Sequence, residues 1–242
     1  MGTPWSRVIP AGDGAILLEF GHHIDEDINR FVHQTADFVR ALDIEGVWGI
    51  VPAFTTLLIE FDPRIVAMGD IVLRLEEPHE DRDQEPPRLF EIPVRYGEEM
   101  GPDLMAVADY AGMSPEAVIQ QHSAATYRIY CLGFSPGFPL CGVVPEKLRM
   151  PRRASPRPVV PAGSVAIAGA QTGVYPMESP GGWNIIGRTP AHLFDWTKVP
   201  TVPFAPGDAI RFVPVSEDQY RVLAIEAQEG RQVIREVPHA TA

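Results

Sequence analysis

The stretch at residues 131–142, CLGFSPGFPLCG, contains the spacing of a serine nucleophile. Residues 133–137, GFSPG, match the G-x-S-x-G pattern of serine hydrolases. In that pattern the residue after the serine donates its backbone N–H to the oxyanion, and a helix follows. Here the next residue is Pro136, which has no N–H, and Gly137 disfavours a helix. We therefore expect that Ser135 is not a nucleophile.

The surrounding segment is rich in glycine and proline. Residues 131–190 contain 9 Gly and 10 Pro, together 19 of 60 residues. Short apolar runs separate them, which is not the pattern of a disordered region. Such a segment either forms structural turns or lets the backbone approach a ligand or a second chain, and both interpretations stay open. The residues expected to shape these loops are Gly133, Pro136, Gly137, Gly181 and Gly182.

Basic residues gather next to these loops. Five of the 20 basic residues fall within positions 147–157, in a chain of net charge −12. The planar guanidinium of arginine suits carboxylate or phosphate. The alternative is that these residues pair with the chain's own acidic side chains, and the sequence favours neither. The predicted substrate- or anion-binding residues are Arg152, Arg153, Arg157 and Arg188.

Three further side chains are candidates for catalysis. Gln171 and Tyr175 lie in AGAQTGVYP, where we expect them to orient a substrate or contact an oxyanion, or else to tie the fold together. His122 is a candidate general base or, alternatively, a cap or packing residue. His22 and His23 lack partners at metal-ligand spacing, so no metal site is predicted.

Composition argues against several other classes of protein. No apolar run approaches the ~20 residues of a membrane span, and the N-terminus lacks a signal-peptide pattern. With 20 basic and 32 acidic residues, nucleic acid is not an expected partner. The two cysteines make no disulfide framework, so we expect a cytoplasmic protein with free thiols.

The elements that must position these side chains fall into two predicted domains, 1–84 and 85–242, joined by the charged, proline-bearing segment 76–87. In the first domain, helical spacing predicts a helix that begins at Asp25, and Pro63 is expected to open a second helix. Strands are expected at 15–20, 46–51 and 56–61.

The second domain is predicted to open with a strand at 88–96 and two short helices within 103–124, joined by a glycine turn. The pair superficially resembles a helix-turn-helix, but no basic recognition face follows. Beyond it, short strands between Gly/Pro turns favour a β-barrel or sandwich. These strands are expected at 164–169, 183–188, 209–215 and 220–225.

Three stretches resemble a known family. They are YCLGFSPGFPLCG, the block from MPRRASPRPVVP to NIIGRTP, and VPAFTTLLIEFDP. They look like allophanate hydrolase subunit 1, of the carboxyltransferase C/D-domain family, which also includes the B subunit of 5-oxoprolinase and an inhibitor of a sporulation histidine kinase. The resemblance covers nearly the whole chain. It implies an α+β protein in which a small N-terminal α/β domain precedes a cyclophilin-like β-barrel.

The resemblance also implies a function. A non-autonomous subunit of an ATP-dependent 5-oxoprolinase would open 5-oxoproline, a small carboxylate, to glutamate. Its site would be shared with a companion C subunit, of the allophanate hydrolase subunit 2 type, and the complex would include an A subunit. ATP would be a co-substrate. No Gly-Lys-Ser/Thr follows Gly169 or Gly173, so ATP is expected to be held in another mode or with a partner subunit. The alternatives are a regulatory kinase inhibitor and a carboxyltransferase or allophanate-hydrolase subunit of urea metabolism.

Overall fold

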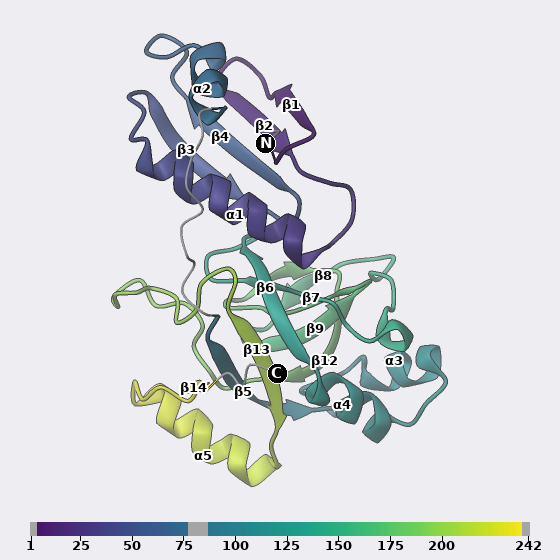
Figure 1. Cartoon of the computed structure of the whole chain (residues 1–242). Helices are drawn as coiled ribbons and strands as arrows, with labels where there is room; N and C mark the ends of the chain where they lie inside the picture. The colour runs from purple at the N-terminus through teal and green to yellow at the C-terminus, as the bar shows by residue number, and fades with distance from the viewer. Residues whose placement is uncertain (1–3, 77–86, 239–242) are drawn as a thin grey trace. The chain divides into compact units, whose positions relative to one another are not determined.

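The structure, a computed structural model, describes residues 4–76 and 87–238. The chain divides into two compact units, Met1–Glu85 and Pro86–Ala242, which we describe separately (Figure 1). The predicted linker at 76–87 lies almost wholly outside the described residues. Within the described ranges, no helix combines the length and the apolar character needed to cross a membrane.

The first unit is a four-stranded antiparallel sheet with two helices, in the strand order β1-β2-β4-β3. Alternate strand residues such as Ile16 and Leu57 are fully buried and form its core with the apolar face of α1 (Glu26–Ala41). This helix begins where it was predicted, because the Asp25 carboxylate accepts the backbone N–H of Ile28. The strands are β1 (Arg7–Pro10), β2 (Ala15–Glu19), β3 (Val47–Pro52) and β4 (Thr56–Phe61).

The second helix of this unit begins later than predicted. Pro63 does not open a helix, since α2 spans Met68–Leu75. The backbone N–H groups of Ile65 and Val66 both donate to the carbonyl of Asp62 and close a turn at Pro63 instead. The Asp62 carboxylate also accepts the N–H two residues on, as aspartate often does in turns. This local turn explains the wrong prediction.

The second unit is a closed seven-stranded barrel with the order β12-β9-β10-β7-β6-β13-β5, in which β12 pairs with β5 to complete the ring. The predicted α+β class and the β-barrel are therefore confirmed. β14 (Arg235–Val237) extends the sheet beyond β5. The barrel strands are β5 (Leu89–Tyr96), β6 (Thr126–Leu132), β7 (Pro139–Gly142), β9 (Ser164–Ala168), β10 (Gln171–Val174), β12 (Asn184–Arg188) and β13 (Ala209–Pro214).

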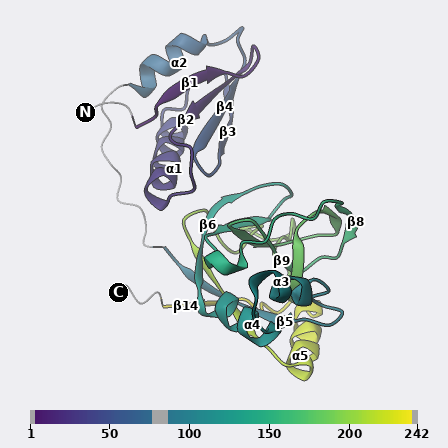
Figure 2. The same cartoon turned by 90° about the vertical axis from the view of Figure 1, so that its right-hand side faces the viewer.

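Helices α3 (Leu104–Ala111) and α4 (Pro115–Ala124) form the predicted pair and pack side by side (Figure 2). Gly112 ends α3 in the left-handed region, at φ 65°, and the Ser114 side chain caps α4. A short 3₁₀ helix, η1 (Glu146–Leu148), and a two-stranded sheet of β8 (Arg157–Val160) and β11 (Ser179–Gly181) lie in the Gly/Pro-rich segment.

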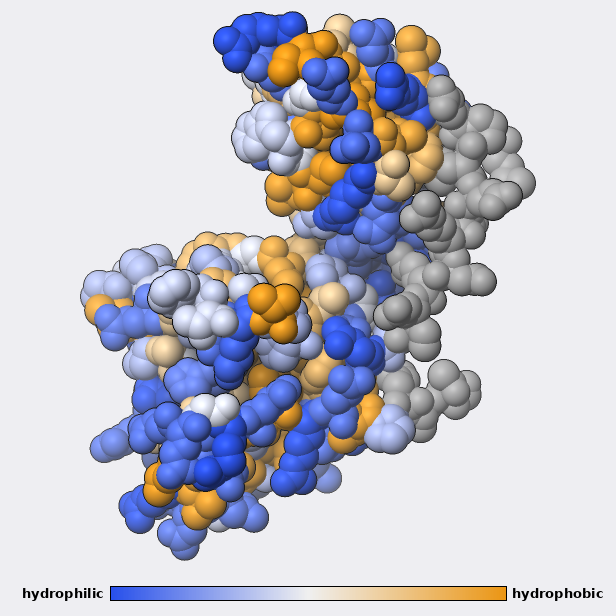
Figure 3. All heavy atoms as spheres, turned by 90° about the vertical axis from the view of Figure 1, so that its left-hand side faces the viewer, coloured by the Kyte–Doolittle hydropathy of each residue, from blue (hydrophilic) through white to orange (hydrophobic). Residues whose placement is uncertain are grey.

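The strand predicted at 220–225 is wrong, because these residues belong to the helix α5 (Glu217–Gln228). Ser216 and Gln219 form a capping box, in which each side chain accepts the backbone N–H of the other residue. This start signal outweighs the β-propensity of Val222 and Ile225, both more than half exposed. Figure 3 shows apolar side chains (orange) at the surface of both units, among hydrophilic side chains (blue).

Candidate functional site

The GFSPG motif forms the turn between β6 and β7. The carbonyl of Ser135 accepts the backbone N–H of Phe138 at 3.0 Å. Pro136 and Gly137, the latter at φ 79°, occupy the two central positions, as in a type II turn. The next element is a strand and not a helix. The turn therefore lacks the architecture of a nucleophile elbow, as the sequence predicted.

This turn presents an aromatic side chain to solvent. Phe134 has φ 69°, a backbone conformation that is strained for a bulky residue, and it is 68% exposed. Its ring makes edge contacts with the rings of Phe138 and Tyr175, at centroid distances of 5.5 and 6.2 Å. Phe138 also contacts Trp183 at 5.4 Å. We call these four residues the aromatic cluster. Such strain collects at functional sites.

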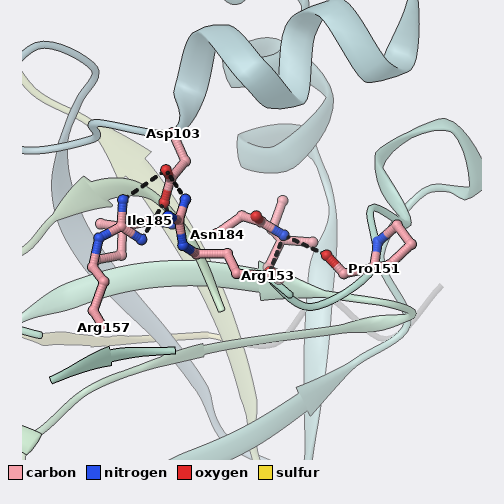
Figure 4. Close-up of polar contacts among 7 residues, drawn as sticks. Asp103, Pro151, Arg153, Arg157, Asn184 and Ile185 are labelled. Carbon is pink, nitrogen blue, oxygen red and sulfur yellow. Dashed lines mark hydrogen bonds and ion pairs between the residues drawn. The ribbon is translucent and has the colours of Figure 1, made fainter. Parts of the chain in front are cut away.

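A buried carboxylate organises two of the predicted arginines. Asp103, at the start of α3, accepts two hydrogen bonds from Arg157, at 2.7 and 2.8 Å, and one from Arg153, at 3.0 Å (Figure 4). It also accepts the backbone N–H of Ile185 at 2.7 Å. For Arg153 and Arg157, the alternative that they pair with the chain's own acid is therefore what the structure shows.

Arg152 is placed differently from these two neighbours. Its guanidinium lies over the ring of Trp183, 5.9 Å from the centroid, and the residue is exposed. Within the described part of the chain, no carboxylate forms an ion pair with it. The segment that carries Arg152 is fixed by Asn184, whose amide donates to the carbonyl of Pro151 at 2.8 Å (Figure 4).

Tyr175 connects the aromatic cluster to the arginines. It is 1% exposed, and burial raises the pKa of its phenol, while a backbone hydrogen bond from Trp183 and the charges of Arg152 and Arg157 lower this pKa in part. Tyr175 therefore carries a neutral phenol near neutral pH. The hydroxyl Oγ of Ser179, two residues before Gly181 on β11, is buried without a hydrogen-bond partner among the described residues.

Two of the predicted loop-shaping glycines are required by their surroundings. A Cβ on Gly181 would lie 2.4 Å from the Tyr175 hydroxyl, and one on Gly137 would lie 2.8 Å from Phe194, in addition to the positive φ. By contrast, a Cβ on Gly133 or Gly182 would meet its nearest neighbour at 3.9 or 3.7 Å, an ordinary contact.

Replacing Gly181 should disturb the site through Tyr175. We expect Gly181→Ala to cost about 1–3 kcal/mol of unfolding free energy, since the buried phenol must move. Gly182→Ala is the matched control, with an expected change below about 0.5 kcal/mol. Urea unfolding of both variants measures the difference. Equal stability of the two variants would contradict the close approach of Gly181 to the Tyr175 hydroxyl.

The other predicted site residues do not join this group. Gln171 opens β10 while Tyr175 follows its end, so about 13 Å of extended strand separates the two backbones. Arg188 interacts electrostatically with Tyr220 of α5. The contacts of the aromatic cluster and Asp103 described above include neither Gln171 nor Arg188.

His122 lies in the barrel core with 0% exposure. Its Nδ1 is 2.8 Å from the Tyr96 hydroxyl, its Nε2 is 3.0 Å from the Thr172 hydroxyl, and its ring stacks on Phe212 at 4.8 Å. Burial lowers its pKa to about 3. In this conformation both ring nitrogens are engaged and no ring atom reaches a substrate, which fits the packing alternative for His122.

The remaining groups are the possible metal ligands and the two cysteines. Among residues 4–76 and 87–238, no group of three or more His, Cys, Asp or Glu side chains could hold a metal ion. Cys131 and Cys141 are buried, and burial raises the pKa of both thiols, that of Cys131 to about 12. Both thiols therefore stay protonated and unreactive near neutral pH.

Three residues that organise the site were not predicted from the sequence as site residues. Asp103 precedes α3 at the N-cap position, yet its side chain makes no capping bond because the arginines and the Ile185 N–H occupy it. Trp183 and Phe134 were predicted only as parts of a strand and a motif. A buried aspartate 50 and 54 residues from its arginines leaves no local signal in the sequence.

Known proteins resemble this chain over most of its length. The family described as carboxyltransferase domain, subdomain C and D, matches residues 6–204. The B subunit of 5-oxoprolinase from Bacillus subtilis (strain 168) is 41% identical over 230 residues, covering 89% of this chain and 95% of that protein. The B subunit from Haemophilus influenzae is 44% identical over 214 residues, covering 86% and 97%.

A solved structure agrees with these relatives. TTHA0988 has 40% sequence identity and a TM-score of 0.76, and the match covers 84% of this chain. The same match covers 40% of the TTHA0988 chain, so this chain spans less than half the length of that structure.

Proposed function

Since this chain belongs to the family of the carboxyltransferase domain, subdomains C and D, we propose that it acts as the B subunit of a heteromeric 5-oxoprolinase. The observation that carries this proposal is the 40–44% identity to three proteins named as the B subunit of 5-oxoprolinase, over 95–97% of their lengths. The name implies an enzyme assembled from several subunits. We propose that the partners are a C subunit and an A subunit.

The chemistry of this role needs sites for two anions. A lactam carbonyl is a poor electrophile, and transfer of the γ-phosphoryl group of ATP to the carbonyl oxygen, with ADP as the leaving group, activates it. Water then adds at the carbonyl carbon, the ring C–N bond breaks as the nitrogen takes a proton, and a second water releases phosphate to leave glutamate. The substrate carboxylate and the ATP phosphates must both be held throughout.

We propose that this chain contributes to the substrate-facing surface, while ATP is held together with a partner protein. The absence of a Gly-Lys-Ser/Thr phosphate loop after Gly169 and Gly173 supports that division. Among the candidates for catalysis, Tyr175 lies beside arginines but is 1% exposed, so we propose the alternative role of tying the fold together there. We assign His122 to the barrel core, and Gln171 stays a candidate at the far end of β10.

Reconstitution tests the proposal. Glutamate formed from 5-oxoproline would be measured with this chain alone, with the C subunit, and with the A and C subunits together, each with and without ATP. We expect glutamate only in the complete mixture with ATP. A stable complex with the C subunit that forms no glutamate in the complete mixture would refute the assignment. Carboxyl transfer or inhibition of a histidine kinase would then be assayed on the same complex.

A further inference from the structure

The three arginines of the MPRRASPR segment differ in what their donors bind. Arg153 and Arg157 share the Asp103 carboxylate, so an internal acid offsets one of their two positive charges. Arg152 is adjacent in sequence, but it lies over Trp183 and makes no ion pair with another described residue. The stacked ring fixes one face of its guanidinium and leaves the N–H edges for a ligand.

The surroundings of Arg152 suit a small anion. Tyr175 is 1% exposed and lies within reach of the charges of Arg152 and Arg157, and its neutral phenol adds no negative charge beside them. Gly181 keeps the backbone against that hydroxyl, and the unpaired Ser179 hydroxyl lies two residues earlier on β11. In a chain of charge −12, this concentration of arginine is a local reversal of sign.

The aromatic cluster supplies an apolar wall. Phe134 is held 68% exposed beside Tyr175 by a strained turn, and Trp183 lies beneath Arg152. An apolar surface next to an arginine fork matches a small ligand that has one oxyanion and an apolar body. Glu178 is exposed in the residue before β11, and it makes no ion pair with Arg152.

We propose that the guanidinium of Arg152, stacked on Trp183, forms a subsite for a small oxyanion, a carboxylate or a phosphate group, with the exposed ring of Phe134 as its apolar wall. Arg152 binds the anion through its N–H edges, while Asp103 occupies one donor of Arg153 and two donors of Arg157. This inference rests on the proposed function for the identity of the ligand, since the carboxylate of 5-oxoproline would be the anion held. The subsite itself follows from the geometry.

Direct binding tests the subsite. Calorimetry would measure 5-oxoproline, inorganic phosphate and ATP against the full chain and its complex with the C subunit. We expect Arg152→Gln to lower the affinity for the probe that binds at least tenfold. Arg152→Lys should recover part of that affinity, because lysine keeps the positive charge but lacks the planar guanidinium. Arg221→Gln, the same charge change on the exposed face of α5, should leave binding unchanged. Glu178→Gln should not weaken it.

The outcomes separate the subsite from the proposed function. If 5-oxoproline binds and phosphate does not, the ligand group is a carboxylate, and the reverse result assigns a phosphate. Tight binding at Arg152 without glutamate formation in the complete mixture would refute the function and keep the subsite. Glutamate formation with an unchanged KM for 5-oxoproline and for ATP in Arg152→Gln would refute the subsite and keep the function. Failure of every probe to bind would also overturn the subsite.

Discussion

Asp103→Ala should be the most destabilising change at the site, with an expected loss of about 3–5 kcal/mol of unfolding free energy. The substitution removes the acceptor of three charge-assisted hydrogen bonds from Arg153 and Arg157 and leaves the buried N–H of Ile185 unpaired. Two like charges would then lie side by side without their counter-ion. Urea unfolding at pH 7.5 measures the loss.

A matched control comes from another ion pair of the same barrel. Glu91 on β5 pairs with Arg211 on β13 at 2.6 Å, but 25% and 40% of their side chains are exposed, compared with 7% for Asp103. We therefore expect Glu91→Gln to cost less than about 1 kcal/mol. Asp103→Asn should fall between the two changes, because the amide oxygen still accepts hydrogen bonds while the charge is lost. A similar loss for Asp103→Ala and Glu91→Gln would show that Asp103 does not organise the arginines.

Local signals in the sequence predicted most of the fold. The start of α1 at Asp25, the glycine end of α3 at Gly112 and the proline-glycine turn at Pro136 each depend on neighbouring residues. The two wrong predictions also have local causes. A turn at Asp62 replaced a helix start at Pro63, and a capping box that begins at Ser216 replaced a strand.

The site was predicted less completely because it is built from distant contacts. Arg152 and Arg153 are neighbours of the same type, and only the folded chain places one on Trp183 and the other on Asp103. The same holds for Asp103, which lies 82 residues from the backbone N–H that it accepts at Ile185. Residue type predicted that arginines here would bind a carboxylate, but it could not separate the internal partner from a ligand.

His122 should make the protein sensitive to acid. Its pKa is about 3 in the folded chain and near 6.5 when it is unfolded, so the unfolded chain binds the extra proton first. This contribution leaves stability unchanged above about pH 7 and lowers it as the pH falls from about 6.5 towards 3. Between pH 7.5 and 5, the expected loss from this one group is about 2 kcal/mol.

His122→Gln isolates this contribution. The variant loses ring stacking on Phe212 and starts less stable at pH 7.5, but its further loss on going to pH 5 should be smaller than that of the unchanged chain by about 2 kcal/mol. His22→Gln replaces a side chain that is 76% exposed, so the burial effect expected of His122 is absent there and this variant serves as the control. Urea unfolding of the unchanged chain and of both variants at pH 7.5, 6 and 5 measures how the unfolding free energy of each protein depends on pH. If His122→Gln loses as much stability as the unchanged chain, the imidazole is protonated within the fold, and His122 would again be a candidate for proton transfer.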